Sequence, residues 1–474
     1  MNHRPGLDRS QTLLFPERLE DYIAAENPAR FLDAFVGSLD LHALGFARAI
    51  CARTGRPPYA PAALLKLYLY GYLHRVRSSR LLEAECHRNV EVLWLLGKLA
   101  PDFKTIADFR KDNLKPLKAV ARQFTLLCRQ LELFGGELLA IDGSKFAAVN
   151  ARDQNFNAAK LQDLIDRADA RLAEYLQQLD TADAAEPGGA PLTKNALAAK
   201  IAALQEKQDW HKELLAELDE EQKQVSVTDP DTRKMPTAHG MIVGYNAQLA
   251  VDAKHKLIAA DDVTNEVNDF KQLANIALAA KANLALKQAE VVADAGYYNA
   301  AEVSRCVEQN ITPYIPKSDT SANTARGLYG KRQFKYDAAK DVYVCPAGGA
   351  LTDRFATYEL GRELRYYRAS GCKSCALKSR CTRNKANRTI TREENEHLME
   401  AMAARMRAQP HKFKLRKTLA EHPFGTIKRW FGYTHFLLKG LAKVQCEWSL
   451  TTLAYNLKRV LNLVSFQKLM AAVA

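Results

Sequence analysis

The chain has 474 residues, too many for one compact core, so we expect two or three domains or one domain with large insertions. Its 47% hydrophobic and 26% charged residues are typical of a globular protein, and no apolar run reaches the roughly 20 residues of a membrane span. The formal net charge of +14 indicates nucleic acid as the partner rather than a membrane, because neither end carries a basic amphipathic helix with a lipid-facing aromatic stripe.

The N-terminal part of the chain has helical apolar spacing. Residues 1–20 lack a signal-peptide pattern, so a cytoplasmic, nucleoid-associated protein is expected. Leu64, Leu65, Tyr68 and Tyr72 share one helical face. The pattern predicts an all-helical domain over residues 1–135.

Basic residues interleave with tyrosines in this helical part. The tyrosines favour a core position, and the arginines favour contact with DNA phosphates, as in a helix-turn-helix reader. The arginines that we assign to DNA binding are Arg56, Arg77 and Arg80.

Short apolar runs then predict an α/β domain over residues 136–474. Five strands are expected, at residues 137–149, 241–252, 256–263, 289–294 and 311–315. The last two follow helices near 269–285 and 300–309, which favours parallel neighbours. Three hairpin-linked strands followed by alternating helices and strands is the order of an RNase H-like fold, with a mixed five-stranded sheet.

Two insertions into this domain are predicted. Residues 155–225 are rich in Ala, Leu, Glu and Lys, with heptad spacing on each side of Pro187, and predict a helical hairpin. The hairpin is either paired internally or an arm for a dimer. Residues 318–387 predict a small β-rich insertion that contains four cysteines.

Three widely separated acids occupy equivalent positions in the predicted sheet domain. Asp142 lies in the first strand, Asp294 ends the fourth, and Glu421 is expected to open a helix after the fifth. Their carboxylates are the hard oxygen ligands that Mg²⁺ prefers, and two such ions can activate an attacking hydroxyl and stabilise a leaving oxygen. Single acids of this kind are more often caps or turn residues. Their combined placement favours phosphodiester chemistry.

The residues around the third acid carry a family resemblance. The stretch from Phe413 to Lys428, with Arg416 and Glu421, resembles the Y-R-E-K signature of bacterial insertion-sequence DDE transposases. Phe413 stands where the subgroup often has Tyr, and the Arg lies one residue further from the Glu than usual. Other stretches resemble the same family: 55–59, 101–106, 140–145, 244–252, 293–298 and 432–440.

This resemblance implies a DNA-cleaving enzyme. Asp142, Asp294 and Glu421 would hold two Mg²⁺ or Mn²⁺ ions, while Arg416 and Lys428 would grip phosphates near the scissile bond. The family binds terminal inverted repeats, frees 3′-hydroxyl ends and transfers them to target DNA as a homodimer or larger synaptic assembly. An RNase H-like nuclease or resolvase without joining, and an inactive DNA-binding relic acting as a repressor, are the alternatives.

Two competing interpretations concern single residues. Glu447 is the alternative third acid, although a surface or helix-packing role is favoured. The many cations near Glu421 form either a phosphate-binding region or a solvated helix face.

The clustered cysteines are Cys345, Cys372, Cys375 and Cys381. A Cys-x-x-Cys pair with two further thiols can complete a tetrahedral structural zinc site. Reduced thiols in a small β-rich insertion are the alternative. We expect this insertion to contact transposon-end DNA through its arginines and tyrosines.

Overall fold

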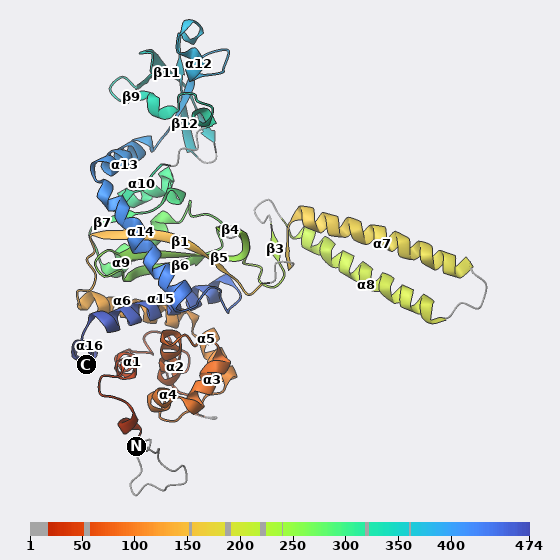
Figure 1. Cartoon of the computed structure of the whole chain (residues 1–474), viewed down its shortest axis with the longest axis vertical. Helices are drawn as coiled ribbons and strands as arrows, with labels where there is room; N and C mark the ends of the chain where they lie inside the picture. The colour runs from red at the N-terminus through yellow and green to blue at the C-terminus, as the bar shows by residue number, and fades with distance from the viewer. Residues whose placement is uncertain are drawn as a thin grey trace, which may run out of the picture.

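The computed structural model describes residues 18–51, 57–150, 154–184, 191–218, 224–238, 240–317, 322–359 and 362–474. A central body carries two extensions (Figure 1), a helical arm to one side and a separate small sheet at one end. The mixed α/β class with many helices, predicted from the sequence, is confirmed.

A mixed sheet forms the centre of the body. β1 pairs antiparallel with β5 on one side and parallel with β7 on the other, and β8 continues parallel beyond β7. The free edge of β5 is shared by β4 and β6, which pair with successive parts of it. The strands are β1 (Leu138–Ala147), β4 (Arg233–Thr237), β5 (Gly240–Asp252), β6 (Ile258–Thr264), β7 (Ala289–Val292) and β8 (Ile311–Tyr314).

The predicted sheet of five strands was therefore one strand short. The additional strand is β4, whose sequence Arg-Lys-Met-Pro-Thr has no apolar alternation and buries only Met235. Its Pro236 removes a backbone donor, which an edge strand tolerates. Backbone pairing with the long strand β5, rather than apolar patterning, holds it in place.

The two faces of the sheet are covered by different helices. Leu139 and Ile141 of β1 pack against one set, whereas Leu138 and Ala140 pack against α14. Successive strand residues point to opposite faces, so Asp142 lies on the α14 face. The first set is α9 (Leu273–Leu284), α10 (Ala300–Glu308) and α13 (Glu396–Ala408), and α14 is Pro410–Gly425.

The N-terminal helices and the C-terminal helices share one core. The predicted apolar face of α2 is buried, with Tyr68 and Tyr72 fully enclosed. The same cluster includes Trp448 of α15 and Leu249 of β5, so the helical region and the sheet region pack as one body. The helices are α1 (Pro28–Gly37), α2 (Pro61–Leu73), α3 (Ser79–Arg88), α4 (Val90–Leu95), α5 (Phe103–Asp112), α6 (Leu114–Gln130), α15 (Leu441–Leu463) and α16 (Phe466–Val473).

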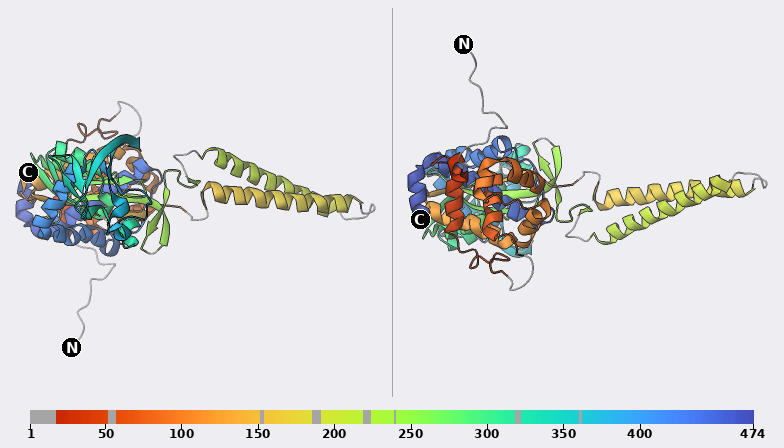
Figure 2. Two further views of the ribbon diagram at one scale, coloured as in Figure 1. Left: turned by 90° about the horizontal axis from the view of Figure 1, so that it is seen from above. Right: turned by 90° about the horizontal axis from the view of Figure 1, so that it is seen from below.

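The helical arm consists of α7 (Ala158–Ala184) and α8 (Pro191–Ala216), which pack against each other and project from the body (Figure 2). The short strands β2 (Asn155–Phe156) and β3 (Val225–Ser226) pair at its base. Leu161 and Ile165 are buried between the helices, as the heptad spacing predicts.

The second extension, which we call the distal sheet, has five antiparallel strands in the order β13-β12-β11-β10-β9. Its last strand lies beyond residue 387, so the sheet is longer than the segment predicted from the sequence. The strands are β9 (Lys335–Asp337), β10 (Val342–Val344), β11 (Ala350–Glu359), β12 (Arg362–Ala369) and β13 (Thr389–Glu393). None of the helices in the described ranges has both the length and the apolar character that a membrane span requires.

Candidate active site

Asp142 and Asp294 lie on neighbouring parallel strands. The register pairs Leu138 with Glu290 and Ala140 with Val292. Continued by two residues, this register brings Asp294, just past the end of β7, level with Asp142 in the middle of β1. Asp294 also accepts a hydrogen bond from the Gly296 backbone N–H at 2.8 Å, which caps the short helix that follows.

Glu421 reaches the same edge of the sheet from α14. It lines a cavity of about 240 Å³ together with Asp142, Gly143, Ser144 and Lys428. Its predicted position at the start of a helix was wrong, because α14 begins at Pro410 and Glu421 lies in the last turns. The first position of a helix favours Pro, and Pro410 therefore starts α14 well before Glu421.

A wide helical turn follows Glu421. Pro423 lacks a backbone N–H, and residues Thr426–Trp430, which we call η6, form a π-helix. Such wide turns occur often at functional sites. The turn directs Lys428 toward β1, where its Nζ lies 2.7 Å from Ser144 Oγ and 3.0 Å from the Lys145 carbonyl oxygen.

Arg416 completes the group predicted from the sequence. Its guanidinium lies 3.6 Å from Asp142 Oδ2, with both side chains largely shielded from solvent. The structure thus gathers Asp142, Glu421, Arg416 and Lys428 between β1 and α14.

The acids influence one another electrostatically. Burial raises the pKa of Asp142 to about 7, against the opposing effect of Arg416. The carboxylates of Asp294 and Asp269 raise it further. Burial is thus the main reason that Asp142 favours its protonated form, and the neighbouring carboxylates add to it.

Asp269 belongs to this region and was not predicted from the sequence. Its Oδ1 accepts hydrogen bonds from Asn246 Nδ2 and Gln248 Nε2, each at 2.7 Å, and lies 3.5 Å from Lys145 Nζ. Asp269 occupies a loop before α9, where a single acid is typical of a turn, so no local pattern identified it. The available signal was the Gly-x-Asn-x-Gln pattern in β5. Because side chains alternate along a strand, it places the amides of Asn246 and Gln248 on one face, where they need a polar partner.

Gly143 makes room for this polar layer. A Cβ at this position would lie 2.4 Å from Gln248 Nε2 and 2.6 Å from Asp269 Oδ1, both too close for real atoms. The Gly in the Ile-Asp-Gly-Ser stretch is therefore required by close approach rather than by a turn.

The three arginines of the N-terminal helical part that were predicted to bind DNA have different surroundings. Arg77 is buried: its guanidinium lies 3.0 Å from Glu447 Oε1 and 4.0 Å from the ring centroid of Tyr433. These contacts argue against a phosphate contact, so we do not retain Arg77 as a DNA-binding residue. Arg80 is exposed beside Phe103. Arg56 lies outside the described residues.

Glu447 has a helix-packing role. It is fully buried and accepts hydrogen bonds from the backbone N–H groups of Leu437 and Leu438, each at 3.0 Å. With Arg77 it joins α15 to the loop after α2. It does not line the cavity that holds Asp142 and Glu421.

The four clustered cysteines line one small cavity of the distal sheet, of about 30 Å³. The Gly349 backbone N–H donates to Cys345 Sγ at 3.2 Å. Burial raises the pKa of the Cys381 thiol, with Arg388 opposing and the other three cysteines adding to the effect. Within the described ranges, no three His, Cys, Asp or Glu side chains are gathered tightly enough to form a ready metal site.

Comparisons with known proteins identify two matching family models. A transposase DDE domain matches residues 344–461, and a transposase domain (DUF772) matches residues 17–112. Among solved structures, the cryo-EM structure of the piggyBac transposase synaptic complex with hairpin DNA has 9% identity and a TM-score of 0.29, covering 94% of this chain and 79% of that chain. A similarity this low carries no argument. The search of curated proteins found no match.

The two family matches support a DNA transposase. More particularly, they support a DDE transposase of the insertion-sequence type. The DDE match includes Arg416, Glu421 and Lys428, whereas Asp142 and Asp294 precede it.

Proposed function

We propose that this DNA transposase binds terminal inverted repeats, cleaves DNA phosphodiesters and transfers the freed 3′-hydroxyl ends to target DNA. The observation that carries the proposal is that Asp142 and Glu421 line one cavity, while Asp294 lies near enough to Asp142 to raise its pKa, although the three acids come from distant parts of the sequence. Arg416 and Lys428 reach the same edge.

An RNase H-like core is part of this proposal. The order β6-β5-β1-β7-β8, with the first three strands antiparallel and the last three parallel, supports it. We assign the core to residues 136–474, with the helical arm and the distal sheet as insertions and residues 1–135 as the DNA-binding part. The Y-R-E-K subgroup is supported by the shared location of Arg416, Glu421 and Lys428.

The acids at the sheet edge have the donor chemistry for divalent metal ions, although the described structure does not gather them into a ready metal site. Three carboxylates supply hard oxygen ligands, and the pKa of Asp142 is raised chiefly by burial and further by the nearby carboxylates of Asp294 and Asp269. Asp142, Asp294 and Glu421 would hold Mg²⁺ or Mn²⁺. When bound, two ions would activate the attacking hydroxyl and stabilise the leaving oxygen.

The basic residues of the site act on the DNA backbone in this proposal. The cavity that Asp142 and Glu421 line is called the acid cavity below. Lys428 donates a hydrogen bond to Ser144 from the wall of this cavity, within reach of a phosphate held there. Arg416 lies 3.6 Å from Asp142 Oδ2 and would be available to a phosphate oxygen if the carboxylates held a metal ion. Both contacts are charge-assisted and position the scissile bond.

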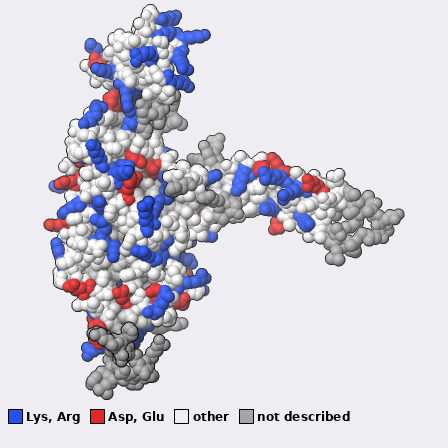
Figure 3. Space-filling view, viewed as in Figure 1, with Lys and Arg blue, Asp and Glu red and all other residues white. Residues whose placement is uncertain are grey.

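We propose that the distal sheet binds structural zinc and contacts DNA. Four thiols around one cavity are the ligand set of a closed zinc site, and the N–H donated to Cys345 Sγ would stabilise a thiolate. Lys and Arg side chains gather at this end of the molecule (Figure 3), including exposed Arg365 and Arg368. A homodimer or larger assembly on two transposon ends is part of the same proposal.

A strand-transfer assay on labelled element ends tests the function. Joined products are expected from the wild type, whereas nicks alone would indicate a nuclease. A shift of the DNA on a gel with neither product would indicate a repressor.

Asp294→Ala should abolish cleavage and retain DNA binding. Asp294→Asn, which keeps an acceptor for the Gly296 N–H, should do the same without loss of the cap. Asp163→Ala, at an exposed position on the arm, is the matched control. Cleavage by both Asp294 variants would show that the wrong acids are named.

A further inference from the structure

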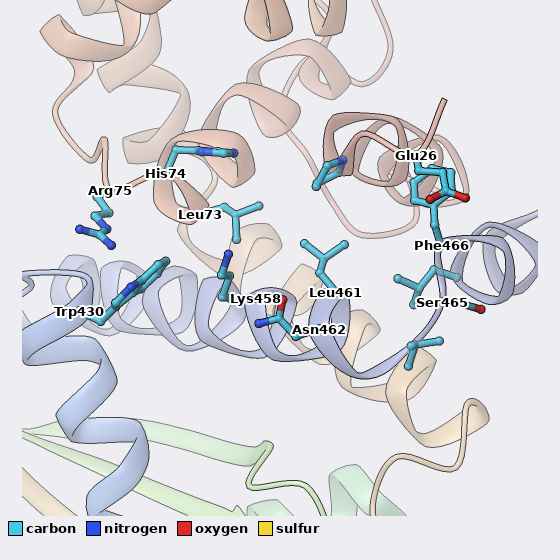
Figure 4. A pocket seen from close by; sticks show the side chains of 13 residues that line it. Glu26, Leu73, His74, Arg75, Trp430, Lys458, Leu461, Asn462, Ser465 and Phe466 are labelled. Atoms are coloured by element: carbon cyan, nitrogen blue, oxygen red, sulfur yellow. The ribbon is translucent and has the colours of Figure 1, made fainter. Parts of the chain in front are cut away.

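A large cavity lies between the N-terminal helices and the C-terminal helices. Its volume is about 580 Å³, within the roughly 300 to 1,000 Å³ of ligand sites. Figure 4 shows Arg75 and Trp430 facing each other at one end, with Leu73 and Lys458 beside the central space. We call this space the Trp430 cavity. The proposed cleavage chemistry does not use it.

An aromatic ring and two cations form one end of the Trp430 cavity. The Arg75 guanidinium lies 4.0 Å from the Trp430 ring centroid, and Lys458 Nζ lies 5.2 Å from it. The Trp430 side chain is nevertheless 42% exposed, unusual for a large aromatic residue. A planar guanidinium on an indole presents its other face as a second stacking surface.

Arg75 takes a left-handed backbone conformation because it lies just past the end of helix α2. Its φ is 69°, in the left-handed region that favours glycine after a helix. The chain turns there, with the Val76 N–H bonded to the Gly71 carbonyl oxygen at 2.6 Å. This turn places Arg75 at the end of α2, beside Trp430.

The Trp430 cavity is connected to the proposed active site through one helix. His422, Thr426 and Trp430 line a second cavity of about 500 Å³ on one side of α14 and η6. Glu421, Gly425 and Lys428 line the acid cavity on the adjacent side. The second cavity and the Trp430 cavity share Trp430, Lys458 and Asn462, so the spaces follow one another around the helix.

The side chains along this path favour a nucleic acid strand. Lys428, Arg429, Lys458 and Arg459 supply positive charge for phosphates. Among the described residues, Glu26 is the one acid that lines the Trp430 cavity, and it lies at the end away from Trp430 (Figure 4). Aromatic side chains beside a basic groove are the usual means of holding unpaired bases.

We propose that the Trp430 cavity binds an unpaired nucleotide of the DNA strand held at the acids, with its base stacked on the Trp430–Arg75 pair. This inference rests on the proposed function, because it takes DNA as the substrate. Lys458 pairs with the phosphate of this nucleotide, and His74 and Asn462 supply hydrogen-bonding groups at the cavity wall. The site thereby distinguishes DNA with unpaired nucleotides from a fully paired duplex.

Binding of two DNA duplexes tests the proposal: one blunt, and one identical but with a short oligo(dA) tail. Trp430→Leu should weaken binding of the tailed duplex by about 5- to 100-fold, the range of base stacking on one aromatic side chain. Binding of the blunt duplex should not change. Trp430→Phe should retain part of the preference for the tail, because its ring still stacks. Quenching of tryptophan fluorescence by the tailed duplex should be lost in Trp430→Phe.

Two further variants separate binding from folding. Trp94 also lies against an arginine, with Arg30 at 5.0 Å, but lines none of these cavities, so Trp94→Phe should retain the quenching. Arg75→Gly should preserve or raise the melting temperature, because glycine relieves the strain, while weakening binding of the tailed duplex.

The outcomes distinguish this proposal from the proposed function. Equal binding of the two duplexes by the wild type, or equal loss on both in Trp430→Leu, would overturn the nucleotide site and leave DNA binding intact. Failure of the wild type to bind either duplex would overturn both.

Discussion

Two regions carry side chains of the kinds that bind metal ions. One is the edge of the central sheet with Asp142, Asp294 and Glu421, which we call the acid edge, and the other is the cysteine cavity of the distal sheet. The surrounding structure supports them differently. Behind the acid edge, Asn246 and Gln248 fix Asp269, and Gly143 leaves space for them. Cys345 follows β10, and the other three cysteines lie in or beside two short helical turns, Cys372–Ser374 and Lys378–Cys381. Gly348 and Gly371, close to these cysteines in the chain, have left-handed conformations. The core beneath the cysteines has only six buried residues. Hydrogen bonds therefore fix Asp269 behind the acid edge, whereas we propose that the distal sheet depends on a bound zinc ion that joins its cysteines.

The largest expected effect is on the distal sheet. Removal of zinc with a chelator, or Cys372→Ser, should unfold residues 335–393, because a core this small does not stabilise a sheet unaided. Hydrogen exchange should show lost protection there and unchanged protection in β1, β5 and β7. Cys51→Ser, at an exposed thiol, is the control.

Metal analysis of the purified protein can contradict this prediction. Purified protein without zinc, together with equal exchange in the presence and absence of chelator, would remove the site and make the four thiols ordinary reduced cysteines.

A smaller effect is expected at the acid edge, where Asp269 positions other groups. Asp269→Asn replaces an acceptor of three contacts and should lower the cleavage rate about 10- to 100-fold, with DNA binding unchanged. The Mg²⁺ concentration for half-maximal cleavage should rise, which a purely structural role would not produce. Asp262→Asn is the matched control, because Asp262 is also partly buried but contacts Gln445 instead. An unchanged metal requirement would show that Asp269 has no part in arranging the acids.

The elements that could be predicted from the sequence are those whose signal is local. β1, β5, β6, β7 and β8 follow apolar runs, and the heptads of α7 and α8 follow their own spacing. Asp142 and Asp294 stood out because each ends or interrupts a buried strand. β4 was missed because pairing with β5, rather than its own side chains, makes it a strand.

The remaining differences come from tertiary contacts. Arg77 resembles the other surface arginines in sequence, but its partner Glu447 is 370 positions away. Asp269 looks like a turn residue until Asn246 and Gln248 are placed beside it. Arg75 and Trp430 meet only because α2 packs against α15. No pattern within a short window contains such pairs.

The smallest effect, a shift in stability with pH, examines the acid edge without DNA. The pKa of Asp142 is raised to about 7 from the usual value near 4, chiefly by burial, so the folded protein favours its protonated form. The folded state is thus stabilised by that proton at low pH and loses this stability as the pH rises from about 4 to about 7. Asp142→Asn has no such carboxylate. In metal-free buffer its melting temperature should therefore exceed that of the wild type by a margin that grows over this interval and is constant above it. Added Mg²⁺ should reverse the order above pH 7, because ion binding stabilises only a protein with the ionised carboxylate. A difference in melting temperature that does not change with pH would mean that Asp142 is ionised throughout this interval. Burial at the acid edge would then not raise its pKa.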